Sequence, residues 1–313
     1  MSLNNLYAAD IGGESVDIFI AAHGYESRAT AVARKMVGAA KSLLCFGFDH
    51  NQVLFFSKNL EWFREHGFRI FPNVTAAEFA PTVTKALFDA AVNAENSDLR
   101  IAVDISSFDR YRLACLIDVL EKLSAERRLT IDFWYSIAAF ERPRPTVGRN
   151  EIAGPVHRKF AGRFLEPGKS LALIAGLGYE LGKVVGVTEY LQASRVVAMF
   201  PVSPIAEYEA EVSRANETLL RDLQEREIIR YRVDDVRRTV ATLDAAVRGL
   251  STEHNVVLFP GGPKVFVLCC LLAQRANPSV AVWRVSSGPS IRPHDSAPSG
   301  VTVGARWEPR SLV

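Results

Sequence analysis

The sequence predicts an α/β protein built from two tandem, doubly wound Rossmann-like domains with mostly parallel sheets, related by pseudo-twofold symmetry. The first observation behind this prediction is an internal repeat, because segment 101–117 aligns without a gap on 256–272 (256 − 101 = 155). The second is that short β-branched apolar runs alternate with helical patterns, which is typical of βαβ units and a parallel sheet.

The repeat continues on both sides of this segment. Residues 16–26 match 170–180 at an offset of 180 − 26 = 154, residues 133–136 match 282–285, and residues 164–167 match 306–309. Four matches in one order indicate a duplicated unit of roughly 150 residues, which is the size of one domain. We therefore expect one domain at 1–167 and a second at 168–313.

The first half contains patterns for five strands and four helices. β-branched and aromatic runs predict strands at 16–22, 42–48, 68–72, 100–105 and 130–137. Apolar residues at i, i+3 and i+4 spacing predict helices at 27–38, 54–66, 80–95 and 109–124. Each crossover is long enough for a right-handed connection.

The second half repeats this order. Strands are expected at 171–176, 195–200, 228–232, 255–259 and 280–285, and helices at 180–192, 205–226, 236–250 and 264–276. Proline- and glycine-rich segments follow each half, an extension at 141–167 and a tail at 286–313. We expect loop or irregular hairpin in the extension, and we expect both segments to belong to the repeat unit.

Composition excludes several classes of protein. The 313 residues are 48% hydrophobic and 23% charged, and 37 basic against 35 acidic residues leave a net charge of +2, which gives no strong attraction to duplex nucleic acid or to a membrane. No apolar stretch reaches the length of a membrane span and no signal segment begins the chain, so we expect a cytoplasmic protein. Cys45, Cys115, Cys269 and Cys270 lie in apolar runs without zinc-site spacing, which predicts buried thiols, no disulfides and no metal site.

The candidate ligand site follows from the predicted sheets. Ligands of open parallel sheets bind beyond the carboxyl ends of the strands. Nine residues of the loops that follow the first and fourth strand of each half are therefore candidate ligand-binding residues: Gly24, Tyr25, Ser106, Ser107, Gly178, Tyr179, Gly261, Gly262 and Lys264.

Each candidate has a binding and a structural interpretation. The turn Pro260–Lys264 offers two glycines and a cation for a phosphate, or it is a tight strand-to-helix turn with Lys264 in water. Ser106 and Ser107 cap the following helix or bind a ligand hydroxyl. The two tyrosines stack on a base or pack between strand and helix.

Common catalytic and cofactor motifs are missing. Gly176, Gly178 and Gly182 place the third glycine one position late for a dinucleotide fingerprint, so no redox cofactor is expected. The sequence contains no phosphate-binding Walker loop, no nucleophile elbow and no His-Glu-x-x-His pair. His23 has no sequence neighbour that would form a metal site or a catalytic dyad.

A duplicated doubly wound unit with the turn Gly261, Gly262 and Lys264 after its fourth strand resembles the CRISPR-associated Rossmann-fold (CARF) sensor domains and related antiphage nucleotide-sensor modules. Ser106 and Ser107 stand in the matching place of the first half. The resemblance implies that two facing domains hold a cyclic oligonucleotide and that binding signals to an effector in antiviral defence.

These observations lead to three hypotheses. The leading one is a non-enzymatic sensor that binds a nucleotide-type ligand in a composite cleft between its halves and signals to a protein effector. The second is a hydrolase or transferase acting on a nucleotide or glycosidic bond, with Glu26 or Asp104 as acid or base. The third is a non-catalytic assembly subunit of a multiprotein defence complex, which predicts an exposed apolar patch near Trp283 or Trp307.

Overall fold

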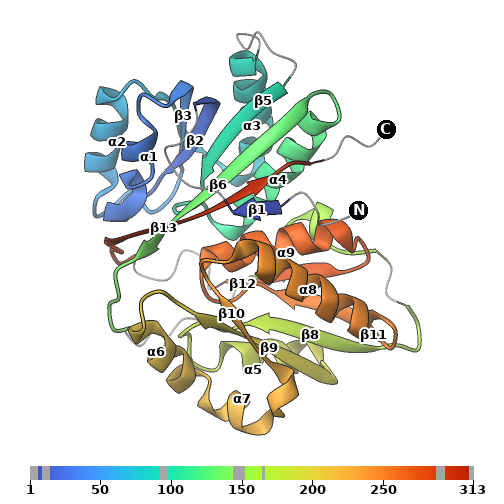
Figure 1. The fold of residues 1–313 in the computed structure, drawn as a ribbon. Helices are drawn as coiled ribbons and strands as arrows, with labels where there is room; N and C mark the ends of the chain where they lie inside the picture. The colour runs from blue at the N-terminus through green and yellow to red at the C-terminus, as the bar shows by residue number, and fades with distance from the viewer. Residues whose placement is uncertain are drawn as a thin grey trace. The chain divides into compact units, whose positions relative to one another are not determined.

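The computed structural model describes residues 6–8, 15–91, 98–143, 152–163, 166–286 and 293–309 (Figure 1). The chain divides into two α/β domains. The first domain comprises residues 4–139 and 292–313, and the second comprises 1–3 and 140–291. Each has one mostly parallel sheet, so the predicted fold class is confirmed.

The sheet of the first domain has the strand order β1-β13-β6-β5-β2-β3-β4. Its strands are β1 (Leu6–Ala8), β2 (Val16–His23), β3 (Ala40–Phe48), β4 (Arg69–Val74), β5 (Asp98–Asp104), β6 (Arg128–Ala138) and β13 (Pro298–Trp307). Its helices are η1 (Ser27–Thr30), α1 (Ala33–Met36), α2 (Phe56–Glu65), α3 (Ala76–Ala91) and α4 (Arg110–Ser124). β2 to β6 pair in parallel, whereas β13 and β1 are antiparallel additions at one edge.

The sheet of the second domain has the order β10-β9-β8-β11-β12-β7. Its strands are β7 (Ile152–Pro155), β8 (Ser170–Gly176), β9 (Arg195–Val202), β10 (Ile228–Arg232), β11 (His254–Phe259) and β12 (Ala281–Ser286). Its helices are η2 (Arg158–Phe160), α5 (Lys183–Leu191), α6 (Glu207–Ala215), α7 (Glu217–Asp222), η3 (Glu225–Glu227), α8 (Val236–Ser251) and α9 (Lys264–Ala276). α8 and α9 cover one face of this sheet, and α5 to α7 lie on the other (Figure 1).

The two sheets share one topology. β2, β3, β4, β5 and β6 correspond in order to β8, β9, β10, β11 and β12, and each set ends on an antiparallel strand. All ten predicted parallel strands are present. The predicted helix at 27–38 is instead the 3-10 turn η1 followed by the single turn α1, and the predicted helix at 205–226 is divided at Asn216 into α6 and α7.

The predicted domain boundary lies at 167/168, whereas the contacts within the structure divide the chain at 139/140 and at 291/292. The tail strand β13 pairs with β6 of the first domain, and β7 of the extension pairs with β12 of the second. β13 was not predicted from the sequence, because proline, serine and glycine at 298–300 are typical of a loop. The alternation of buried and exposed residues typical of a strand begins only after them, with Val303 and Ala305 in the core.

The tails also correspond differently from the sequence match. Pro155 lies opposite Trp283, and Gly304 lies opposite Trp134, so the structure equates β7 with β13 at an offset of 304 − 155 = 149. The match of 164–167 with 306–309 has an offset of 142 and is therefore not structural. At the structural offset Arg306 corresponds to His157, and Phe164 lies outside the described residues.

Each domain has its own apolar core. Phe19, Phe63 and Trp134 pack together in the first domain, and Leu173, Phe200 and Phe259 do so in the second. All four cysteines are free and buried, as predicted. In the described part of the chain, no helix has both the length and the apolar character needed to cross a membrane.

Candidate functional site

The predicted ligand loops meet in pairs at the carboxyl edge of each sheet. In the first domain, a Cβ added to Gly24 would lie 2.7 Å from the Ser107 hydroxyl. In the second, a Cβ added to Gly178 would lie 3.1 Å from the Gly262 Cα. The topology therefore brings the loop after the first strand against the loop after the fourth, which the rule for open parallel sheets predicted.

The two glycines of the second-domain turn are required by backbone packing. A Cβ on Gly261 would lie 2.1 Å from the carbonyl oxygen of Gly176, and one on Gly262 would lie 2.2 Å from that of Leu177. Gly262 also has a φ of +73°, which side chains disfavour. The absence of side chains at Gly261 and Gly262 thus lets their backbone pack closely against the neighbouring loop at Gly176 and Leu177.

A cation and an aromatic ring flank this pair of loops. Lys264 is the first residue of α9, directly after the turn, and is partly buried. Tyr179 is 40% exposed, and its ring centroid lies 6.2 Å from that of Tyr208 in a stacked arrangement. Glu180 accepts a hydrogen bond from the Lys183 ammonium. The second domain therefore presents Gly178, Gly262, Lys264 and Tyr179 at one edge of its sheet.

In the first domain, the equivalent polar groups bond to one another. Asp104 is 2% exposed and accepts the backbone N–H of Ser106, and the fully buried Ser106 hydroxyl accepts the backbone N–H of Ser136. Glu26 forms an ion pair of 2.8 Å with the buried Arg28. Ser106, a predicted ligand-binding residue, is thus buried and hydrogen-bonded within its own domain, as is Asp104, and Glu26 is paired with Arg28.

Arg28 is a permanent cation inside this network. It donates to the carbonyl oxygen of Ser136 at 3.0 Å, and its guanidinium lies 5.7 Å from the centre of the Tyr135 ring. Burial opposes its charged form, but Tyr135 and Glu26 outweigh burial and raise the pKa of Arg28. A buried charge held in this way stabilises the loop after β2 only while its partners remain in place.

The helix after β5 is capped by Asp109, not by Ser106 or Ser107. The Asp109 carboxylate accepts the backbone N–H of Arg112 at 2.8 Å and also pairs with the Arg112 guanidinium. Arg112 is buried, bonds to Asp49 and the carbonyl of Val74, and lies 4.2 Å from the centre of the Phe48 ring. An aspartate three residues before an arginine at a helix start was the available sequence signal. The Ser107 hydroxyl oxygen is buried and has no hydrogen-bond partner among the residues that the structure describes.

The C-terminal tail supplies a carboxylate to the loop after β2. Asp295 accepts the backbone N–H of Ser27 at 2.6 Å and the Ser27 hydroxyl at 2.9 Å. The backbone N–H of Arg28 donates to the carbonyl of Ser296 at 3.3 Å. A carboxylate of the chain itself thus occupies these donors, at a loop where the sequence predicted an external ligand.

One buried asparagine holds the first loop in each domain, and sequence reasoning missed both. The amide of Asn59 donates to the carbonyls of Gly24 and Glu26, each at 2.9 Å. The amide of Asn216 donates to the carbonyls of Gly178 and Val212 at 2.7 and 2.8 Å. The separation of the two asparagines in sequence is close to the repeat offset, and that spacing was the available signal.

Tyr25 is partly buried and His23 is buried. Burial and the nearby Glu26 raise the pKa of Tyr25 to about 12. His23 is buried, its Nε2 lies 2.7 Å from the carbonyl of Phe56, and burial lowers its pKa. Among the described residues, no group of three or more His, Cys, Asp or Glu side chains could hold a metal ion.

No protein-family model and no curated protein matches the chain. Among solved structures, the chain is similar to the cytoplasmic domain of a prokaryotic cation chloride cotransporter, over 88% of this chain and 97% of that one. The identity is 8% and the TM-score 0.25. So weak a likeness carries no argument about function.

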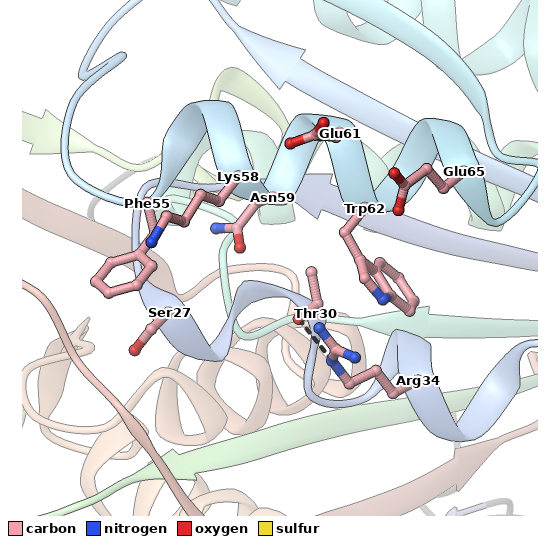
Figure 2. A pocket seen from close by; sticks show the side chains of 9 residues that line it. All are labelled: Ser27, Thr30, Arg34, Phe55, Lys58, Asn59, Glu61, Trp62 and Glu65. Atoms are coloured by element: carbon pink, nitrogen blue, oxygen red, sulfur yellow. Dashed lines mark hydrogen bonds between the residues drawn. The ribbon is translucent and has the colours of Figure 1, made fainter.

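A hollow of about 540 Å³ lies in the first domain between η1–α1 and α2 (Figure 2). Its two cations already stack on its two aromatic rings. Arg34 lies 4.7 Å from the centre of Trp62, and Lys58 lies 5.5 Å from the centre of Phe55. Trp62 also stacks on His66 at 4.1 Å. The residues that line the hollow all belong to the first domain, and its two cations already contact its aromatic rings.

Proposed function

We propose that the second domain binds a phosphate-bearing, nucleotide-type ligand at the carboxyl edge of its sheet, and that the protein is a sensor or regulator. The observation that carries this proposal is the position of Lys264. It begins α9 directly after the Gly261–Gly262 turn, beside the Gly178 loop and the exposed Tyr179.

The chemistry of these groups suits such a ligand. The N-terminus of the 13-residue helix α9 carries partial positive charge, and Lys264 adds a full one, so both favour phosphate. A half-exposed tyrosine offers one ring face for stacking on a base.

Sensing is favoured over turnover by the state of the two candidate carboxylates. Asp104 is buried and hydrogen-bonded, and Glu26 is paired with Arg28. A general acid or base has to reach the bond that it cleaves. The resemblance to CARF sensor domains extends the proposal to a cyclic oligonucleotide ligand, a protein effector and a role in antiphage defence.

A thermal-shift screen of linear and cyclic oligonucleotides and common nucleotides tests the proposal. A ligand at about 100 times its Kd stabilises the folded state by about 2.7 kcal/mol. For a domain of this size, that is a rise in Tm of about 5–10 °C. Lys264→Ala should abolish the shift. Lys169→Ala is the matched control, because Lys169 precedes β8 at the opposite edge of the same sheet. The proposal fails if no ligand shifts the wild type, or if Lys264→Ala retains the shift.

One observation favours the assembly-subunit alternative. Tyr190 is 64% exposed, and its ring centroid lies 6.3 Å from that of Trp283, where that hypothesis expects an apolar patch. If this patch joins copies of the chain, the sedimentation coefficient rises with concentration in the wild type and does not in Tyr190→Ser. Unchanged sedimentation of the wild type across concentrations argues against self-assembly through this patch.

A further inference from the structure

We propose that the two repeats exchange their last strands, so that the chain is the covalent counterpart of a strand-exchanged dimer. β7 is the next strand along the chain after β6, yet it pairs with β12. β13 is the next strand after β12, yet it pairs with β6. Each repeat therefore completes the sheet of the other.

The register of pairing shows that the exchanged strands are equivalent. Trp134 and Trp283 occupy matching positions on β6 and β12, at an offset of 283 − 134 = 149. Their partners Gly304 and Pro155 are related by the same offset. Both pairings are antiparallel. β7 and β13 thus occupy equivalent positions in the two sheets, and each of them comes from the other repeat.

Connection length does not force the exchange. The median connection between elements of a compact domain is about 4–6 residues, and sequential strands usually lie side by side. The connections 139–151 and 287–297 are both longer than that median. Each tail is therefore long enough to turn back onto the edge strand that it follows, where it would again form antiparallel backbone hydrogen bonds. A choice between two such pairings has to be made by side chains.

Charge on the edge strands selects the exchanged pairing. Asp132 of β6 is almost fully buried and accepts two hydrogen bonds from Arg306 of β13, at 2.7 and 3.1 Å. At the offset of 149, the residue that corresponds to Asp132 is Ala281, and the residue that corresponds to Arg306 is His157. Self-pairing would place Arg306 beside an alanine and remove both of its hydrogen bonds from the buried Asp132 carboxylate. That carboxylate would keep the hydrogen bond from Arg100 of β5, at 3.0 Å, but lose its bidentate partner, which is costly.

A further contact fixes the exchanged tail. Asp295, three residues before β13, bonds to the backbone and hydroxyl of Ser27 in the first domain. The tail thus contacts the first domain at two points: Asp295, before β13, bonds to Ser27, and Arg306, within β13, bonds to Asp132. Neither sheet is complete without the other repeat, so we expect a cut between the repeats to leave them associated.

Cleavage of the full-length folded protein tests this expectation. A protease site inserted between Arg163 and Phe164 separates β1–β7 from β8–β13. Under the proposal, the two fragments co-elute from a size-exclusion column without denaturant and separate in urea. If each tail paired with its own repeat, the fragments would share no strand.

Cysteine pairs distinguish the two pairings directly. Ser136 lies opposite Thr302, and Ala153 lies opposite Val285. Cysteines at 136 and 302, or at 153 and 285, should therefore form disulfides that join the cleaved fragments on a non-reducing gel.

The same four positions supply the matched controls, because self-pairing would oppose 136 to 153 and 285 to 302. We expect at least about tenfold more disulfide in the exchange pairs than in the control pairs, since a disulfide requires the two Cα atoms within about 7 Å. Disulfides in the control pairs, or fragments that separate without denaturant, would overturn the proposal.

Discussion

Replacing Asn59 tests whether one buried amide fixes the loop after β2. Asn59 is 5% exposed, and its Nδ2 atom donates to the carbonyls of Gly24 and Glu26. Asn59→Ala removes both hydrogen bonds and takes this donor away from two carbonyl oxygens of partly buried residues. Each hydrogen bond contributes about 1 kcal/mol net, and an unsatisfied buried acceptor costs about 1–3 kcal/mol.

These terms overlap, so we expect the free energy of unfolding of the first domain to fall by about 3 kcal/mol. For a domain of this size, that corresponds to a loss of about 6–12 °C in Tm. Asn59→Asp keeps the shape but turns a carboxylate oxygen toward two carbonyls, and we expect it to destabilise the domain further.

Scanning calorimetry and urea denaturation measure the effect. Gln52→Ala is the matched control, because Gln52 also donates two hydrogen bonds, to Phe48 and Asn73, from an exposed position where water can replace them. Its cost should stay below about 1 kcal/mol. Equal losses in Asn59→Ala and Gln52→Ala would refute the reasoning, because burial would then make no difference.

Other parts of the molecule carry three further predictions. Gly262→Ala should destabilise the second domain by at least about 1–2 kcal/mol, because a residue in the left-handed conformation gains a Cβ atom 2.2 Å from the Leu177 carbonyl oxygen. Gly186→Ala in α5 is the control: its added Cβ would have no atom within 4 Å, so it should stabilise the domain by about 0.5–1 kcal/mol. Urea denaturation measures both changes. Burial lowers the pKa of His23, so the folded state disfavours its protonation, and the free energy of unfolding should fall as the pH drops below about 6.5. The urea midpoints at pH 7.5 and pH 5.5 should therefore differ less in His23→Gln than in the wild type. An identical pH dependence in the two proteins would contradict this prediction. The four buried cysteines should not react with Ellman's reagent until the protein unfolds, since burial raises the pKa of Cys115 to about 11 and also raises the pKa values of Cys45 and Cys269. Rapid reaction in the native state would show that the thiols are accessible.

Most of the parallel core of the fold could be predicted from sequence, because its signals are local. Each buried strand is a short apolar run, and each long helix repeats its apolar residues at helical spacing, as in α9, whose predicted bounds 264–276 match the structure. The failures came where tertiary contacts override local pattern. The segment 27–38 is short and tied to Asp295 of the tail, and it forms η1 and α1 in place of one helix.

The candidate site was predictable as a location but not as a set of roles. The carboxyl-edge rule correctly paired the loop of Gly24 with that of Ser107, and the loop of Gly178 with that of Gly262. It could not show which polar groups face inward. The Ser106 hydroxyl accepts a hydrogen bond from the backbone N–H of Ser136, which lies 30 residues away in sequence. No local sequence pattern predicts such a contact.

The two domains have therefore diverged at the same position of one architecture. In the first domain, the polar groups at the carboxyl edge of the sheet bind one another. Asp295 accepts a hydrogen bond from Ser27, and Glu26 forms an ion pair with Arg28. Asp109 caps α4, whereas the corresponding helix of the second domain, α9, begins at Lys264. A loop that satisfies its own donors gains little from a ligand, because binding would have to break those bonds first. In the second domain, the N-cap of α9 is Pro263, whose side chain makes no capping hydrogen bond, so no carboxylate occupies the position that Asp109 holds in the first domain. For the proposed phosphate-bearing ligand, this difference is the physical reason to test Lys264 first.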